Sequence, residues 1–231
     1  MESKHVAVIA GLGLGSVAHG ANSVKALLDE INAAGGTAAP FPISSYNTTD
    51  VNTAFAQIRA HYQGQPIRIA LYNAVHGVWK PFLDITPEDI QAVTQTSIEG
   101  TFSFSKNVIQ AFQANQVDEK GKRGSLIFTG AALSVRGNVT TSTFSAEKHV
   151  LRALSQSLAK EFGKQNIHVS HISTFSKCSF LATDCNDPEQ EQNEDVRLSP
   201  DGIAESYLHL IKQPHSAWMW ELDLCPAHEK W

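Results

Sequence analysis

Short apolar runs alternate with longer amphipathic segments along this chain. The run Val6–Ala10 is continuously apolar and is followed by glycines, the pattern of a strand buried on both faces of a parallel sheet. Val24, Leu27 and Ile31 then recur at helical spacing before Gly35, where the predicted helix ends. Read in this way, the sequence predicts strands over residues 6–10, 37–42, 67–72, 125–129, 167–172 and 218–224, and helices over residues 23–34, 50–62, 86–114, 145–162 and 199–212.

Strands that alternate with helices of this length are typical of βαβ units, in which a right-handed crossover joins parallel strands. A chain of 231 residues fits one large domain better than two, and no repeat or linker interrupts the pattern. We therefore expect a single α/β domain over residues 1–231, built as a Rossmann-like, doubly wound parallel sheet.

Composition narrows the functional classes. The net charge of −5 and the pI of about 6.0 give no basic surface for nucleic acid, so we expect no nucleic-acid partner. No apolar run reaches the length of a membrane span, and we expect no membrane association. The three cysteines, Cys178, Cys185 and Cys225, form no C-x-x-C pair, which favours a reducing, cytoplasmic setting.

Gly11, Gly13 and Gly15 follow the first predicted strand, where glycines let a backbone turn sharply and approach a pyrophosphate. Such a cluster is weak evidence when it stands alone. Four further features follow at ordered spacing, namely Asn73-Ala74 after a middle strand, the strand over residues 126–130, the pair Phe144 and Lys148, and the closing run 216–226. Together these features resemble the short-chain dehydrogenase/reductase family over nearly the whole chain. The tail over residues 217–231 is similar to a subgroup with phenylalanine in place of the family's tyrosine.

The resemblance implies a catalytic set of asparagine, serine, tyrosine and lysine, and one of these four residues is retained. Lys148 matches the lysine, but Phe144 stands at the tyrosine position. Ala132, next to Ala131, stands at the serine position, and Ser97 stands at the asparagine position.

These changes affect proton supply. In the family, the tyrosine hydroxyl protonates the developing alkoxide and the serine hydroxyl binds the substrate oxygen. Phe144 has no proton to give, a loss that costs about 10²–10⁴ in rate, and Ala132 has no hydrogen bond to offer, a loss of about 10²–10³. The candidates that remain for donating the proton instead are Ser145, Thr143 and a bound water.

The resemblance also implies NAD or NADP as cofactor, held by Gly11, Gly13, Gly15, Asn73 and Lys148. The lysine of this family usually bonds the nicotinamide ribose. Persistence of the glycines and the lysine as structural relics is the competing interpretation.

One βα unit of the family pattern is absent between Val17 and Ser23, and the residue that distinguishes NAD from NADP is absent with it. Val17 replaces the third glycine, and Ser44 replaces the acid that touches adenine in relatives. Because unpaired backbone groups are costly, we expect residues 37–42 to pair with residues 6–10 in a six-stranded sheet. A coding exon missing from this sequence is the alternative explanation of the gap.

Other candidate residues have plain interpretations. His168 and His171 face opposite sides of a strand, so we expect no metal site. His149 is read as a helix surface residue, with a role as an acid as the alternative. The acidic segment 184–197 is read as a surface loop, with a substrate lid as the alternative.

Three aromatic residues lie on the long predicted helix, Phe102, Phe104 and Phe112, and they are read as core or helix-pairing positions. In relatives the long helices pair subunits, so the resemblance implies a homodimer or tetramer. Trp218 and Trp220 alternate on the last predicted strand and share one face, which packs against the core or a partner subunit.

The sequence therefore favours a divergent NAD(P)-dependent oxidoreductase acting on a small carbonyl or alcohol, with weak or lost activity. The alternative is a catalytically inactive remnant of the family that acts through association with a partner or an intact relative.

Overall fold

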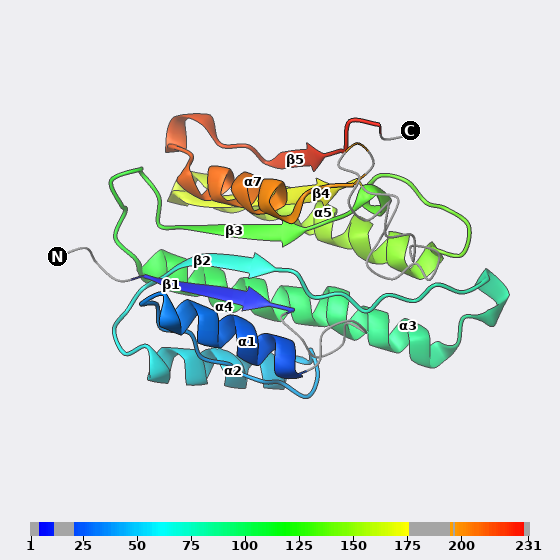
Figure 1. Cartoon of the computed structure of the whole chain (residues 1–231), viewed down its shortest axis with the longest axis horizontal. Coiled ribbons are helices and arrows are strands. Elements are labelled where there is room, and N and C mark those ends of the chain that lie inside the picture. Colours follow the sequence, from blue (N-terminus) through cyan, green and yellow to red (C-terminus); the bar gives the residue numbers. More distant parts are fainter. Residues whose placement is uncertain (1–4, 12–20, 176–194, 196, 229–231) are drawn as a thin grey trace.

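A computed structural model describes residues 5–11, 21–175, 195 and 197–228. Within these ranges one sheet of five parallel strands has the order β1-β2-β3-β4-β5, and Figure 1 shows all its arrowheads at one edge. The strands are β1 (Val6–Ala10), β2 (Ile67–Tyr72), β3 (Gly124–Thr129), β4 (Ile167–Thr174) and β5 (Glu221–Leu224). The expected α/β class with a parallel sheet and flanking helices is confirmed.

The α-helices among the described residues are α1 (Ala21–Ala33), α2 (Thr48–His61), α3 (Pro87–Thr94), α4 (Thr101–Ala114), α5 (Ser142–Phe162) and α7 (Pro200–Lys212). Short helical turns are η1 (Phe82–Asp84), η2 (Gln95–Gly100), η3 (Ala132–Ser134), η4 (Gly163–Gln165) and η5 (His215–Ala217). In this part of the chain, no helix combines the length and hydropathy needed to cross a membrane.

The helix predicted over residues 86–114 consists of three segments, because the π-helical η2 separates α3 from α4. It begins at Thr86, whose hydroxyl accepts from the Asp89 backbone N–H at 3.2 Å while the Asp89 carboxylate accepts from the Thr86 N–H at 2.9 Å. π-Helical turns occur preferentially at functional sites. Ser97, the residue predicted to stand at the asparagine position, lies in this turn.

Two apolar clusters hold the layers together. On one face of the sheet, α2, α4 and α5 pack around a buried aromatic group in which the Phe104 ring centroid lies 5.4 Å from that of Phe55 and 5.3 Å from that of Tyr72. On the other face, Leu210 of α7 packs against Ile127 and Ile172. Figure 1 shows α7 in front of β3 and β4, with α4 and α5 behind the sheet. Helices thus cover both faces.

The prediction of a six-stranded sheet was wrong. Residues 37–42 form no strand, and β1 pairs with β2 alone within the described ranges. Pro40 and Pro42 lack the N–H groups that a strand ladder needs. Phe41 instead packs its ring at 5.7 Å from that of His61. As a result β1 lies at the sheet edge, and Ile9 is exposed.

The prediction that Trp218 and Trp220 alternate along a strand was also wrong, because β5 begins at Glu221. The Trp218 ring stacks on the buried His168 ring, with centroids 4.9 Å apart and planes 12° apart. Trp220 is exposed, although its carbonyl accepts from the His171 N–H at 2.8 Å. Trp218 is therefore positioned by stacking on the His168 imidazole, whereas the Trp220 side chain is exposed to solvent.

Burial of His168 makes stability depend on pH. Burial lowers the pKa of this imidazole from 6.5 to about 4, so the folded chain keeps it neutral where the unfolded chain charges it. Its contribution is fully present above pH 6.5 and is lost as the pH falls toward 4. Between about pH 7.5 and about pH 5, urea unfolding should show a loss about 2 kcal/mol larger in the wild type than in His168→Phe. Equal losses in the two proteins would contradict this account.

Candidate functional site

The carboxyl ends of β1 and β2 bring Gly11 and Asn73 together. The Asn73 N–H donates to the Ala10 carbonyl at 3.1 Å, and the Asn73 side chain is exposed. Gly11 has φ +90, and a Cβ atom there would lie 2.6 Å from the Ala74 backbone nitrogen. Only glycine fits this turn. Gly13 and Gly15, also predicted to bind cofactor, and Val17 lie outside the described residues.

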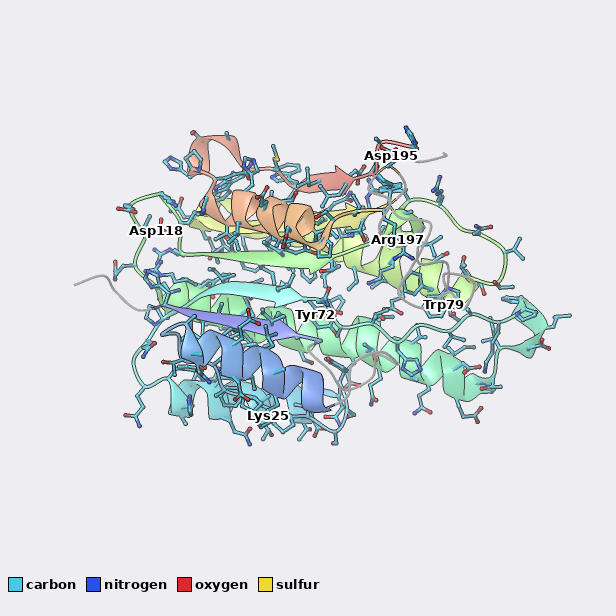
Figure 2. All side chains as sticks on the ribbon, in the orientation of Figure 1. Lys25, Tyr72, Trp79, Asp118, Asp195 and Arg197 are labelled. Carbon is cyan, nitrogen blue, oxygen red and sulfur yellow. The ribbon has the colours of Figure 1, made fainter. Side chains whose placement is uncertain are left out.

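Lys148 and Phe144 lie on the inner face of α5. The Lys148 Nζ donates to the Thr129 carbonyl at 3.0 Å and lies 5.5 Å from the centroid of the Phe144 ring. Burial lowers the pKa of Lys148, and the charge of Glu147 acts in the opposite direction. The Phe144 ring also packs on Trp79, with centroids 4.9 Å apart. Figure 2 shows Trp79 beyond the arrowhead end of the sheet, where β2 has passed into its loop.

The turn η3 carries Ala132, the residue predicted at the serine position, and it is half-buried. A serine that the sequence reasoning missed, Ser134, is fully buried in the same turn. Its Oγ accepts from the Ala131 N–H at 3.1 Å and lies 3.4 Å from the His171 Nε2. Burial lowers the pKa of His171 to about 4, so this imidazole is neutral at pH 7. The signal was available, because Ser134 stands only two residues after Ala132.

Ser97 and Glu147 form a second buried polar pair, between η2 and α5. Each side chain is 1% exposed, and within the described residues neither makes a hydrogen bond of standard geometry, although the Ser97 hydroxyl and the His76 backbone N–H approach the Glu147 carboxyl and favour its charged form. Burial raises the pKa of Glu147 to about 7, while the charge of Lys148 and the neighbouring Ser97 hydroxyl act in the opposite direction. Both residues, with Thr143, line a cavity of about 250 Å³.

Sequence reasoning also missed Glu147, although a signal existed. Glu147 stands three residues after Phe144 and four before Leu151, both of which are buried on α5. That spacing puts it on the buried stripe of an amphipathic helix. An acid on such a stripe, next to a lysine, is a perturbed group at a candidate site.

The two side chains predicted as replacement proton donors are already engaged. The Thr143 hydroxyl donates to the Val78 carbonyl at 2.8 Å, and the Ser145 Oγ lies 3.0 Å from the Thr141 hydroxyl. His149 is exposed, and its Nδ1 lies 2.7 Å from the Ser145 carbonyl one turn earlier on α5. That position agrees with its interpretation as a helix surface residue.

The loop before α2 adds Tyr46, which the sequence reasoning did not identify. Burial raises the pKa of Tyr46, and a hydrogen bond to the Gly11 backbone acts in the opposite direction. Ser44, predicted to stand at an adenine-contacting position, donates its hydroxyl to the Asp50 carboxylate at 2.6 Å. Ser44 is thus used to hold its own loop.

The described residues contain no cluster of histidine, cysteine, aspartate or glutamate that could hold a metal ion. His168 and His171 are both buried on β4. Of the acidic segment 184–197, only Asp195 and Arg197 are described, so its interpretations as surface loop and as lid lie outside the described residues.

The three phenylalanines of the long helix divide between core and surface. Phe104 and Phe112 are buried in the main apolar cluster, whereas Phe102 is exposed. Ile90 of α3 and Ile98 of η2 are exposed as well. Each of α3, η2 and α4 therefore exposes a large apolar side chain to solvent.

The short chain dehydrogenase family profile matches residues 6–194 of this chain. Carbonyl reductase family member 4 of Xenopus laevis is 28% identical over 134 residues, which are 55% of this chain and 52% of that protein. The chain spans about half the length of the first curated relatives it matches.

Solved structures agree on the fold. A short-chain dehydrogenase from Rhodopseudomonas palustris has a TM-score of 0.73 at 24% identity, covering 95% of this chain and 97% of that one. A gluconate 5-dehydrogenase from Burkholderia cenocepacia, in complex with NADP and tartrate, has a TM-score of 0.76 at 16% identity, covering 96% and 94%. At these identities the likeness shows the fold alone.

The close approach of Gly11 to β2 predicts a graded response to alanine. Gly64→Ala adds a Cβ in open space at φ +71, so only the backbone conformation should cost stability, by about 1–2 kcal/mol. Gly11→Ala meets the backbone of Ala74 as well, and we expect a further loss of about 1–3 kcal/mol. Urea unfolding of both variants measures the difference, and equal losses would show that β1 and β2 do not meet as described.

Proposed function

Because this chain belongs to the short chain dehydrogenase family, we propose that it is an NAD(P)-dependent oxidoreductase of a small carbonyl or alcohol, with weakened chemistry. The observation that carries this proposal is the placement of Lys148. Its ammonium is buried at the carboxyl edge of the sheet, but its aromatic neighbour on α5 is Phe144, which has no hydroxyl. The site thus combines the family's lysine with a ring that cannot donate a proton.

The residues at the sheet edge fit a dinucleotide. Gly11 leaves no side chain over the turn after β1, and the exposed Asn73 lies beside it. Lys148 spends one N–H on the Thr129 carbonyl, which leaves its other donors for ribose hydroxyls. We propose that these residues, with Gly13 and Gly15, hold NAD or NADP. The NADP in the related gluconate 5-dehydrogenase structure supports this assignment.

When bound, the nicotinamide would supply a hydride to the substrate carbon. The remaining work is done by side chains. Phe144 excludes water from the space beside Lys148, since its ring packs on Trp79. Ala132 gives the substrate oxygen no hydrogen bond, and Ser97 lacks the amide of the family's asparagine. We therefore expect turnover to be limited by proton supply and by weak stabilisation of the developing charge.

The second candidate is an inactive family member that acts by association. The observation that favours it is the exposed apolar surface formed by Ile90, Ile98 and Phe102 along α3, η2 and α4. A surface of this kind would be covered by the same helices of a second copy or of an intact relative. We propose a homodimer or tetramer through these helices, which is compatible with either function.

Cofactor binding separates the two candidates. NADH and NADPH titrated into the full chain should quench tryptophan emission by energy transfer to the nicotinamide, because the chain has four tryptophans. We expect saturation at or below about 1 mM, and weaker binding in Lys148→Met. Lys164→Met, at an exposed lysine after α5, is the matched control and should bind like the wild type. No signal at about 1 mM cofactor would eliminate the oxidoreductase and leave the associating remnant.

Restoring the missing groups should restore rate. Phe144→Tyr combined with Ala132→Ser returns a proton donor and an oxyanion donor, so reduction of a panel of small carbonyls should rise by about 10²-fold or more. Phe102→Tyr, which adds a hydroxyl on the exposed face of α4, is the control and should give no rise. If cofactor binds and the double variant stays at the wild-type rate, residues other than these two limit the reaction.

A further inference from the structure

A larger cavity lies at the end of the sheet opposite the proposed cofactor site. It has a volume of about 490 Å³ and lies between the last turn of α5 with η4 on one side and the segment 215–220, which precedes β5, on the other. The first residues of β4, residues 167–169, also line it. Figure 1 shows the chain between α7 and β5 at the end of the sheet away from the arrowheads. A volume of this size is in the range of small-molecule sites.

The cavity exists because β5 begins late. β4 pairs with β5 only from His171 onward, so residues 167–170 have no strand beside them on this side. Trp218 fills part of the gap by stacking one face of its ring on His168. The Trp220 side chain stays 49% exposed, and the remaining space is open. Two indole rings therefore border a groove, and such rings offer flat apolar surfaces on which another ring can stack.

The charges around this groove are unbalanced. Along α5, Arg152 and Gln156 both donate to the Glu221 carboxylate, at 2.9–3.0 Å and 2.5 Å. One turn further along come Lys160 and then Lys164, and both line the cavity. The described residues that line the cavity include no acid, and in this part of the chain neither lysine has an ion pair. Two ammonium groups are thus left without a counter-ion in a chain whose net charge is −5.

Ammonium groups next to indole rings are complementary to a planar ring that carries an acid group. The ammonium binds a carboxylate through a charge-assisted hydrogen bond, and the indole stacks on the ring. Asn166 adds a polar group to the lining. Its backbone is held in a left-handed turn at φ 62, where its carbonyl accepts from the Arg123 N–H at 2.8 Å. A small inorganic anion would leave the indoles exposed, and an uncharged ring would leave the lysines without a counter-ion.

We propose that this cavity is a second ligand site, which binds a planar aromatic carboxylate of one or two rings. The ring stacks against Trp220, and the carboxylate pairs with Lys160 and Lys164. The inference does not rest on the proposed oxidoreductase function, because the cavity shares no residue with the site of Lys148 and Asn73 and lies at the other end of the sheet. Cofactor and aromatic acid can therefore be bound at the same time.

Titration of the full chain with naphthoate, followed by ligand-observed NMR, tests the site. At pH 7 and low salt we expect one site with a Kd of about 0.1–1 mM. Naphthalenemethanol keeps the rings without the charge, and cyclohexanecarboxylate keeps the charge without an aromatic ring. Each should bind about tenfold or more weakly than naphthoate. Raising the salt from about 0.05 M to about 0.5 M should weaken naphthoate binding, since the lysines are exposed.

Substitutions locate the bound naphthoate. Lys160→Gln combined with Lys164→Gln removes both charges but keeps polar side chains, so the Kd should rise about tenfold. Trp220→Leu keeps an apolar side chain without a flat ring, and the Kd should rise about three- to tenfold. Lys106→Gln, at an exposed lysine of α4, is the matched control and should bind like the wild type. All four positions are exposed, so these variants should unfold in urea close to the wild type.

Three outcomes would overturn the proposal. The first is a naphthoate Kd that neither the double lysine variant nor Trp220→Leu changes. The second is a Kd that rises in Lys148→Met, which would place the ligand at the cofactor end of the sheet. The third is self-association that Trp220→Leu abolishes in a chain that does not bind naphthoate, which would assign this surface to a second copy. Absence of cofactor binding would remove the proposed oxidoreductase and leave this site untouched.

Discussion

The site depends on the burial of Lys148 where α5 packs on β3. Burial lowers the pKa of the Lys148 ammonium, and within the described residues the Thr129 carbonyl, the Phe144 ring face and the charge of Glu147 favour its charged form. The carbonyl fixes α5 against β3, because the contact requires Thr129 to end its strand opposite Lys148. The turn η3, which follows β3, also packs against α5. Lys148 thus fixes the geometry of the contact between α5 and β3.

The cofactor side follows from a different constraint, the position of β1 at the sheet edge. In the expected family pattern further strands lie beyond β1, and here the described chain enters α1 and reaches α2 without adding one. The segment 37–42 cannot fill the place because of its prolines, and it serves as a strap that packs Phe41 against α2. Tyr46, held near Gly11 by the same loop, then occupies space beside the turn after β1.

The sequence predicted the parallel sheet well, because continuous apolar runs such as residues 67–72 leave little ambiguity about a buried strand. It failed where a local pattern competed with context: residues 37–42 look apolar but contain two prolines, and Trp218 is placed by stacking on His168. The π-helical turn at Ser97 has no periodic signature that separates it from an α-helix. Within the site, the positions of Phe144 and Lys148 followed from their spacing. The surroundings of the Glu147 carboxyl did not, since they depend on which groups of η2 and of the loop after β2 approach it.

Energetics bear on whether the site is a relic. Burial raises the pKa of Glu147 from 4.5 to about 7, so the folded chain binds a proton that the unfolded chain has released. The resulting destabilisation grows as the pH rises from 4.5 and is fully present above 7, where it amounts to about 3 kcal/mol. That is a large share of the 5–15 kcal/mol that typically stabilises a domain. A neutral residue at position 147 would avoid this cost. A buried acid that costs stability is a perturbed group of the kind that gathers at functional sites, and its retention is compatible with the residual chemistry proposed above.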